Sequence, residues 1–224
     1  YISFLEICFH LKPNVIVMGN VPEIRRFKNS SGFLVLDDIQ SRLSENGYTL
    51  SWSVLNAAHF GVPQNRNRFF LVALKGRKEF HFPPPIYQVN GDLISDKCLT
   101  VKDAIGDLPR VAPKQFPEGS IMQYSTPPKT NYQENMRKHS SQVTNHISMQ
   151  HTQKTIEKFQ FIREKVTEKT YDQNHRMIDP NKPGPTITAS FYSSFIHYDQ
   201  NRNLTVREAA RIQSFPDTFE FKGK

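Results

Sequence analysis

The sequence predicts an α/β fold with a regular first part, a loop-rich middle part and a regular return. In residues 1–75, segments of helical periodicity alternate with short apolar or alternating segments, which is the element order of an α/β layer structure. Beyond residue 75, three consecutive prolines at 83–85 stiffen the chain and few periodic segments follow. We therefore divide the chain into residues 1–75, 76–175 and 176–224.

The first part begins with a helix, a strand and a second helix. Residues 2–11 place apolar side chains at near-helical spacing, and Pro13 ends that helix. Residues 15–18 are all apolar, which predicts a strand buried on both faces. Residues 31–46 are helical again, and Gly47 stands where a C-terminal glycine cap belongs.

Two further strands complete the first part. Residues 48–55 alternate between large apolar and small polar side chains, which predicts a half-buried strand. Residues 68–74 are mostly apolar and predict a second strong strand. The element order is therefore helix, strand, helix, strand, turn, strand.

Regular structure returns late in the chain. Residues 155–169 have helical periodicity, and residues 186–190 are a short strand candidate. Thr205 is a good N-cap residue, and Glu208 three positions later completes a capping box for a helix over 206–213.

The composition excludes several protein classes and favours an anionic partner. With 29 basic and 21 acidic residues the net charge is +8, which suits a polyanion such as nucleic acid. No apolar run approaches the length of a membrane span, and no signal peptide is expected. Cys8 and Cys98 are too few for a disulfide framework or a four-ligand zinc site, which favours a cytoplasmic setting and no bound metal.

Phosphate-binding and nucleophile motifs are missing from the sequence. No two glycines lie closer than 13 residues, so no Gly-x-Gly loop can approach a nucleotide cofactor. Both cysteines are expected to pack as small apolar residues.

The segment Gln64–Asn–Arg–Asn–Arg68 is the strongest local signal. Arg66 and Arg68 alternate at the start of a buried strand, so both can project from one face. Two guanidiniums on a rigid edge can bind a phosphate, a carboxylate or a base oxygen. Surface charge beside a strand is the alternative explanation.

Together with other segments, this motif resembles the DNA cytosine-5 methyltransferases. The resemblance covers nearly the whole chain in the family's order. Its segments are Gln-x-Arg-x-Arg at 64–68, Thr-Val-Lys-Asp-Ala-Ile-Gly-Asp-Leu-Pro at 100–109, Pro-Gly-Pro-Thr-Ile-Thr at 183–188 after Arg176, and Leu-Thr-Val-Arg-Glu-Ala-Ala-Arg-Ile-Gln-Ser-Phe-Pro-Asp at 204–217. Residues 12–21 look like the segment that ends in the family's Glu-Asn-Val motif.

The resemblance implies a fold and a reaction. Residues 1–75 would be the C-terminal part of a Rossmann-like methyltransferase sheet, with an inserted target-recognition region at 76–175 and a return segment at 176–224. A complete enzyme would transfer a methyl group from S-adenosylmethionine to C5 of a flipped cytosine in duplex DNA. In a bacterium it would be associated with the nucleoid.

The family's cofactor loop, Phe-x-Gly-x-Gly, and its Pro-Cys nucleophile would both precede Tyr1, and a Gly-Asn-x-Val-Pro-Pro segment would follow Lys224. The chain therefore resembles the C-terminal half of such an enzyme. Besides duplex DNA, an N-terminal half or subunit that carries the cofactor loop and the nucleophile is an expected partner. Alone, the chain is expected neither to bind the cofactor tightly nor to methylate DNA.

The resemblance also assigns site residues. Arg66, Arg68 and Asn20 would be catalytic, but Gly19 stands where the family has the glutamate that holds cytosine N3 and the amino group. Glu23 is not expected to replace that acid. The residues expected to bind DNA are Gln64, Arg137, Lys138, Lys154 and Arg176.

Two further hypotheses stay open. The missing acid and nucleophile favour a catalytically inactive DNA-binding or partner subunit of a split or degenerate methyltransferase. An unrelated RNA-binding domain is disfavoured, because the sequence lacks an aromatic platform motif. The DNA target, and a role in restriction–modification, are not readable from the sequence.

Overall fold

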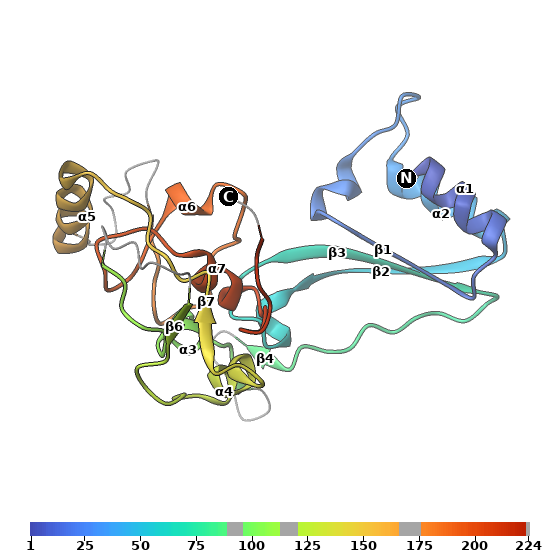
Figure 1. Ribbon diagram of the computed structural model, residues 1–224. Helices are drawn as coiled ribbons and strands as arrows, with labels where there is room; N and C mark the ends of the chain where they lie inside the picture. The colour runs from blue at the N-terminus through green and yellow to red at the C-terminus, as the bar shows by residue number, and fades with distance from the viewer. Residues whose placement is uncertain (89–95, 113–120, 166–175, 223–224) are drawn as a thin grey trace.

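The computed structural model describes residues 1–88, 96–112, 121–165 and 176–222. Figure 1 shows an elongated molecule, with a sheet and two helices at one end and many short elements at the other. Each end is built on a cluster of buried apolar side chains, and we call these clusters the first core and the second core. None of the described helices is long and apolar enough to cross a membrane.

The first core lies between two helices and a three-stranded antiparallel sheet of order β1-β3-β2. Helices α1 and α2 cover one face of this sheet (Figure 1). The elements are α1 Ile2–Leu11, β1 Val15–Asn20, the 3-10 helix η1 Pro22–Arg26, α2 Val35–Glu45, β2 Tyr48–Asn56, the 3-10 helix η2 Ala57–Phe60 and β3 Asn67–Lys75. The predicted helix at 2–11 and the strands at 48–55 and 68–74 are thereby confirmed.

The second helix starts later than its periodicity predicts. Residues 28–34 form a tight hairpin in which Asn29 Oδ1 accepts hydrogen bonds from the backbone N–H groups of Ser31 and Phe33, so α2 begins only at Val35. The predicted cap is confirmed, because Gly47 follows the helix with a φ of +77°.

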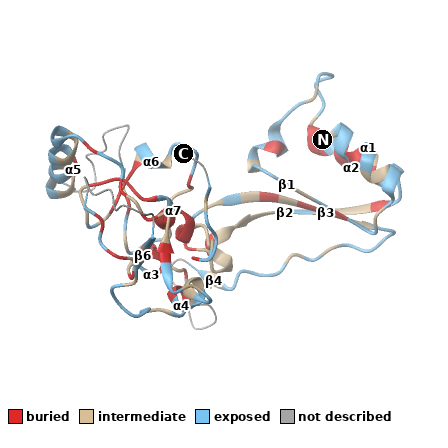
Figure 2. Ribbon diagram, in the orientation of Figure 1, coloured by how far each residue is buried: buried red, intermediate tan, exposed pale blue. Residues whose placement is uncertain are grey.

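Strand β1 is not buried on both faces, and that prediction is wrong. Ile16 points into the first core, but the side chains of Val15 and Val17 are 51% and 58% exposed. The reason is that β1 is the edge of the described sheet and that α1 and α2 cover only one of its faces (Figure 2). The alternating burial of β1 is typical of a sheet with one covered face.

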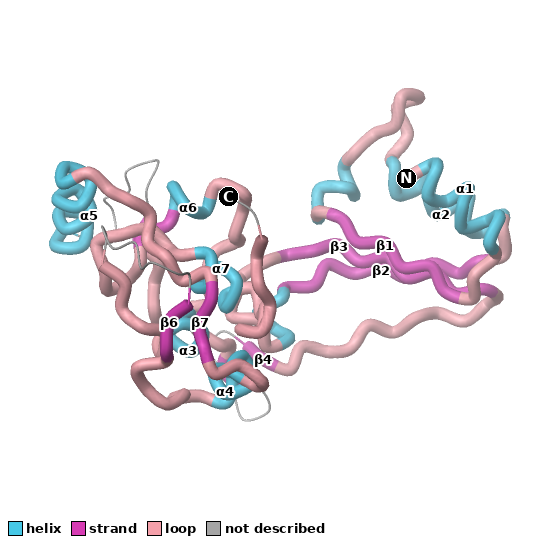
Figure 3. The backbone as a smooth tube through the Cα atoms, viewed as in Figure 1, coloured by secondary structure: helices cyan, strands magenta, loops and turns pink. Residues whose placement is uncertain are grey.

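The loop after β3 returns along the sheet. Figure 3 shows the segment between β3 and β4, Tyr87–Gln88, running beside β2 as an extended loop. Its Phe80 backbone N–H donates to Ser51 Oγ on β2 at 3.0 Å. This loop leads the chain from the first core to the second.

The second core joins α3, Val101–Ile105, and α4, Asn131–Arg137, to α7, Val206–Ile212. Residues of the predicted middle and return segments thus share one core, and the division into three segments stays a prediction. The other elements are β5 Asp96–Lys97, β6 Ile121–Gln123, β7 Gln142–Thr144, α5 Gln153–Lys165, β8 Arg176–Met177, α6 Phe191–Ser194 and β9 Phe195–Ile196.

Two of the three elements predicted for the later part of the chain are found, and one is not. The capping box of α7 is confirmed, because Glu208 N–H donates to Thr205 Oγ1 and Thr205 N–H donates to a Glu208 carboxylate oxygen. Helix α5 confirms the helix predicted at 155–169 as far as Lys165, and residues 166–169 lie outside the described residues. The predicted strand at 186–190 is wrong: its backbone is irregular, although Ile187 is buried.

Candidate functional site

The sheet brings three of the four predicted catalytic positions to one end. Because β1 and β3 are antiparallel, β1 ends where β3 begins, and Asn20 pairs with Phe69 while Gly19 pairs with Phe70. Side chains alternate along a strand, so position 19 lies on the same face as Phe70 and Arg68, and Asn20 lies on the opposite face. Asn20 Oδ1 accepts the Val21 N–H at 2.8 Å and thereby shapes the turn after β1.

Arg66 lies just before β3 and is half-buried. Its Nη1 donates to the Ile187 carbonyl at 3.3 Å. Burial, and secondly the positive charge of Arg68, lower the pKa of Arg66. In the described part of the chain no carboxylate forms an ion pair with either guanidinium. Among the described residues, the pair is therefore a cationic feature without a counter-charge.

The Pro-Gly-Pro-Thr-Ile-Thr segment is attached to the loop that carries Arg66. Asn65 N–H donates to the Gly184 carbonyl at 2.7 Å, and Gly184 N–H donates to the Pro63 carbonyl at 2.8 Å. Thr186 Oγ1 donates to the Asn65 carbonyl at 3.0 Å. Two motifs separated by more than a hundred residues thus form one unit, a link that sequence spacing does not reveal.

Gly184 permits this close approach. A Cβ added there would meet Ile212 Cγ2 at 2.9 Å, and both the Pro63 carbonyl oxygen and Val101 Cγ2 at 3.3 Å. Only a residue without a side chain fits between α3, α7 and the loop that carries Arg66.

Gly19 has the opposite surroundings. A Cβ added there would meet only Phe70 Cε1, at 4.0 Å, which is ordinary van der Waals contact. A side chain at position 19 would therefore find room on the face that carries Arg68.

The residues predicted to bind DNA have different environments. Lys138, Lys154 and Arg176 are exposed. Gln64 is only 1% exposed, and its Nε2 has no hydrogen-bond partner among the described residues. Neither location tests DNA binding, so these assignments stay predictions.

Arg137 is engaged inside the protein. Its Nε lies 2.8 Å from Asp107 Oδ2, its Nη2 donates to the Thr126 carbonyl at 2.8 Å, and its guanidinium lies 3.7 Å from the centre of the Tyr124 ring. Sequence reasoning missed this role, because these partners come from distant segments. A DNA contact by Arg137 stays a prediction.

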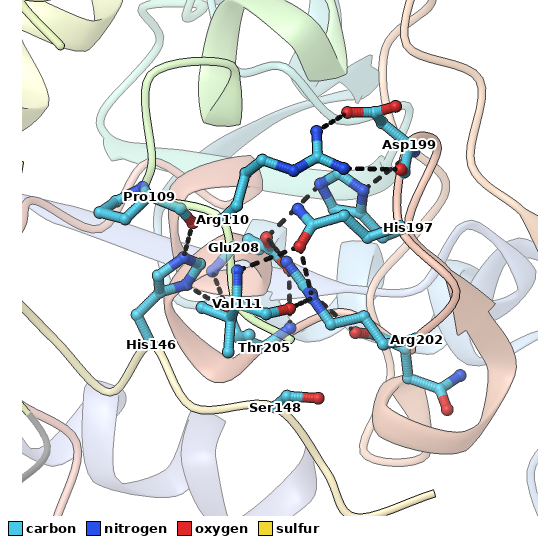
Figure 4. Close-up of polar contacts among 12 residues, drawn as sticks. Pro109, Arg110, Val111, His146, Ser148, His197, Asp199, Arg202, Thr205 and Glu208 are labelled. Atoms are coloured by element: carbon cyan, nitrogen blue, oxygen red, sulfur yellow. Dashed lines mark hydrogen bonds and ion pairs between the residues drawn. The ribbon is translucent and has the colours of Figure 1, made fainter. Parts of the chain in front are cut away.

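A second polar cluster is buried around α7 (Figure 4). The Arg202 guanidinium donates to both carboxylate oxygens of Glu208, at 2.8 and 2.7 Å. Burial alone would raise the pKa of Glu208, but the charges of Arg202 and His197 and the hydrogen bonds from Arg202 hold it well below its usual range. All three side chains are buried, which indicates a structural role.

Two histidines complete this cluster. His197 Nδ1 accepts the Asp199 N–H, so Nε2 carries the proton and lies 3.5 Å from Glu208 Oε1. His146 bridges Thr205 Oγ1 and the Pro109 carbonyl at 2.8 and 2.7 Å. Among the described residues, no group of three His, Cys, Asp or Glu side chains could hold a metal ion.

Comparisons with known proteins identify the family. The family model of C-5 cytosine-specific DNA methylases matches residues 1–224. The type II methyltransferase M.DdeI of Desulfomicrobium norvegicum is 36% identical, over 100% of this chain and 58% of its own length. The type II methyltransferase M1.HphI of Haemophilus parahaemolyticus is 32% identical, over 99% of this chain and 53% of its own length. The chain thus spans little more than half of these relatives.

Solved structures agree on the fold. A prophage-encoded protein of E. coli, assigned as a DNA modification methyltransferase, superposes with a TM-score of 0.72 at 21% identity, over 99% of this chain and 64% of that chain. The Dnmt2 methyltransferase of S. pombe superposes with a TM-score of 0.52 at 14% identity, over 100% and 62% of the two chains. The α/β fold of this chain is that of methyltransferases with a Rossmann-like sheet, and the chain belongs to the C-5 cytosine-specific DNA methylase family.

Proposed function

We propose that the chain is the C-terminal part of a DNA cytosine-5 methyltransferase, which methylates C5 of a flipped cytosine in duplex DNA when the rest of the catalytic domain is present. The observation that carries this proposal is that Arg68 shares the sheet face of position 19 at one end of the sheet, with Arg66 on the loop just before β3. Ligands of open α/β sheets bind beyond the carboxyl ends of the strands, and β1 ends there.

In this proposal the two arginines bind and orient the base. Arg66 is held by Ile187 and is partly desolvated, so its remaining N–H groups can donate to a carbonyl oxygen of the cytosine ring. Arg68 adds a second positive charge on the same face. Both would favour the negative charge that develops on the ring when a nucleophile adds to C6.

The described residues do not by themselves fit S-adenosylmethionine. The left-handed glycines of the described chain, Gly32, Gly47, Gly61 and Gly76, each belong to a separate turn, so they do not make a glycine-rich loop. We therefore assign the main cofactor loop to another part of the domain. The cofactor supplies the methyl group when bound, and the contribution of this chain is to hold the cytosine.

Two exposed apolar surfaces support the presence of a further part of the catalytic domain that packs against this chain. Helix α1 exposes Phe4, Ile7 and Leu11 on the side away from Leu5, and β1 exposes Val15 and Val17 at the edge of the sheet. A helix that is apolar all round is normally buried, and an uncovered edge strand is a template for another strand. We propose that the part carrying the cofactor loop and the nucleophile packs here, either in the same chain or as a subunit.

A second candidate function rests on Gly19. Without an acid at this position the ring nitrogen of cytosine cannot be held as the family mechanism requires. The chain would then be a DNA-binding or partner subunit that does not support methyl transfer.

One experiment separates the two candidates. The purified chain is mixed with the N-terminal part of a full-length relative, labelled S-adenosylmethionine and unmethylated genomic DNA, and label in DNA is measured. The leading proposal expects label with both parts and none with either alone. The second candidate expects label only when Gly19→Glu replaces the parent chain, with Gly19→Gln as the matched neutral control. Label from the chain alone would contradict both. No label from any mixture would contradict the leading proposal and the assignment of the missing acid to position 19.

A further inference from the structure

A short segment after β1 has features that the proposed function does not use. Arg25, Arg26 and Lys28 are exposed cations within four residues. Between and beside them, the residues Phe27 and Phe33 are 50% and 69% exposed. Large apolar rings that face solvent next to several cations indicate a binding surface. We call residues 25–33 the cationic hairpin.

Hydrogen bonds hold the backbone of the cationic hairpin in a defined turn. Val35 N–H donates to the Phe27 carbonyl, and Asn29 and Phe33 are joined by a backbone bond and by the Asn29 side chain. Gly32 adopts a φ of +84°, which closes the turn. Ile24 anchors the base of the hairpin in the first core. The exposed rings therefore project from an ordered support, which lowers the entropy cost of binding.

The charges of the hairpin are available to a partner. In the described part of the chain, neither Arg26 nor Lys28 takes part in an ion pair or a side-chain hydrogen bond. Arg25 donates to the Pro22 carbonyl and lies 5.9 Å from the Trp52 ring centre, so it is partly engaged. Glu23 is the acidic residue nearest in sequence, and the surface keeps a positive excess. Cations for phosphates combined with aromatic rings for bases are the chemistry of sites that bind single-stranded nucleic acid.

The hairpin follows the candidate site along the chain. It begins five residues after Asn20, and in Figure 1 η1 lies at the end of the sheet nearer the second core, on the face covered by α1 and α2. We propose that the cationic hairpin binds an unpaired stretch of the DNA strand outside the cytosine site, with Arg26 and Lys28 on phosphates and Phe27 and Phe33 against unstacked bases. This inference rests on the proposed function, in which a base leaves the duplex.

Fluorescence anisotropy of the full chain tests the ring contacts. Three probes of one sequence are compared: a single strand, a paired duplex and a duplex with a mismatched bubble. Phe27→Leu with Phe33→Leu keeps apolar side chains but removes the rings. We expect this variant to bind the single strand and the bubble at least about fivefold more weakly, since base stacking on aromatics is strong. Binding of the paired duplex should change less than about twofold.

The phosphate contacts are tested with a charge-matched pair of variants. Arg26→Ala with Lys28→Ala should reduce the slope of log affinity against log salt by about 0.7 for each phosphate of a single strand that is no longer bound. Lys12→Asn with Lys75→Gln removes the same charge from exposed positions at the far end of the sheet, and its slope should stay close to that of the parent. If the two variants have equal salt slopes, the effect comes from the net charge alone, and the proposed phosphate contacts are wrong.

The binding of bases by the rings is tested by crosslinking. A single strand that carries 5-bromouracil is irradiated with the parent chain, and the crosslinked peptides should include Phe27 or Phe33. If the parent binds DNA but the ring variant behaves like the parent and no such peptide appears, this inference fails alone, and the exposed rings belong to a protein interface. If the parent binds none of the probes, the proposed function fails with it.

Discussion

At the scale of single residues, two glycines of this chain meet opposite surroundings. Gly184 lies between Ile212, Val101 and the Pro63 carbonyl, whereas Gly19 has open space beside Phe70. The first therefore serves close packing, and the second leaves room for a Cβ at the position where the sequence resemblance implies an acid.

This contrast predicts different effects of the same substitution. Gly184→Ala should lower the free energy of unfolding by about 1–3 kcal/mol, because the new methyl group overpacks the contact with Ile212. Gly19→Ala should cost nothing, since it fits and removes glycine from a strand interior. Urea unfolding monitored by circular dichroism measures both. Equal destabilisation by the two variants would contradict the packing role of Gly184.

At this scale the sequence identified candidate site residues but could not predict which groups surround them. The motif at 64–68 led to Arg66 and Arg68, and the structure places Arg68 on the sheet face of position 19 and Arg66 just before β3, bonded to the Ile187 carbonyl. The same reasoning could not show that Gln64 is buried or that Arg137 pairs with Asp107, because both facts depend on segments that are distant in sequence. Long-range polar pairing leaves no local pattern.

At the scale of elements, α7 is unusual because its charged side chains are buried as well as its apolar ones. Arg207, Glu208 and Arg211 lie in the interior, and each is paired. Removing one partner of a buried ion pair leaves an uncompensated charge, so such a helix tolerates little change.

This helix should make stability depend on pH through His197. Burial lowers the pKa of His197 to about 4, below the value of about 6.5 in an unfolded chain. As the pH falls below about 6.5, the unfolded state takes up this proton and the folded state does not, so the free energy of unfolding decreases. Glu208, with its lowered pKa, adds its own loss at more acidic pH.

Urea unfolding at pH 7, 6 and 5 measures the effect. The parent should lose about 2 kcal/mol between pH 7 and 5 through this residue, with a slope that approaches about 1.4 kcal/mol per pH unit below pH 6.5. His197→Asn retains an acceptor for the Asp199 N–H but does not titrate, so most of that loss should disappear. His10→Asn makes the same substitution at an exposed position and is the control for the substitution itself.

Element patterns predicted the fold where local and tertiary preferences agree. The alternation of 48–55 and the capping box of α7 are local signals, and both are confirmed. The strand expected at 186–190 is wrong: Thr186 and Ile187 are joined to the loop at 64–66 by side-chain hydrogen bonds, and the backbone bridge to Gln64 is made by Gly184. The apolar run at 15–18 does form a strand, but its second face has no cover in the described chain.

At the scale of the whole molecule, charge and exposed apolar surface have separate places. The apolar side chains of α1 and β1 that lack cover lie around the first core, while the buried ion pairs gather around α7 beside the second core. The net charge of +8 comes from cations spread along the sequence, so DNA binding should involve several weak contacts.

We therefore predict weak binding of duplex DNA that is sensitive to salt. With about three to five phosphates contacted, affinity should fall roughly 40-fold or more when the salt concentration rises fourfold. Lys138→Ala with Lys154→Ala should weaken binding further and reduce the salt slope by up to about 2, because each phosphate contact contributes about 0.9. Arg137 is left in place, because it holds Asp107 and its loss would disturb folding.

The control removes two cations from the opposite end of the molecule. Lys12→Asn with Lys75→Gln changes the net charge equally, and asparagine tolerates the left-handed backbone of position 12. Anisotropy at two salt concentrations should then separate a local contact from a general charge effect. If both variants show the same drop in affinity, or if the affinity of the parent ignores salt, then residues 76–175 do not form the DNA-contacting region and the target-recognition assignment is wrong.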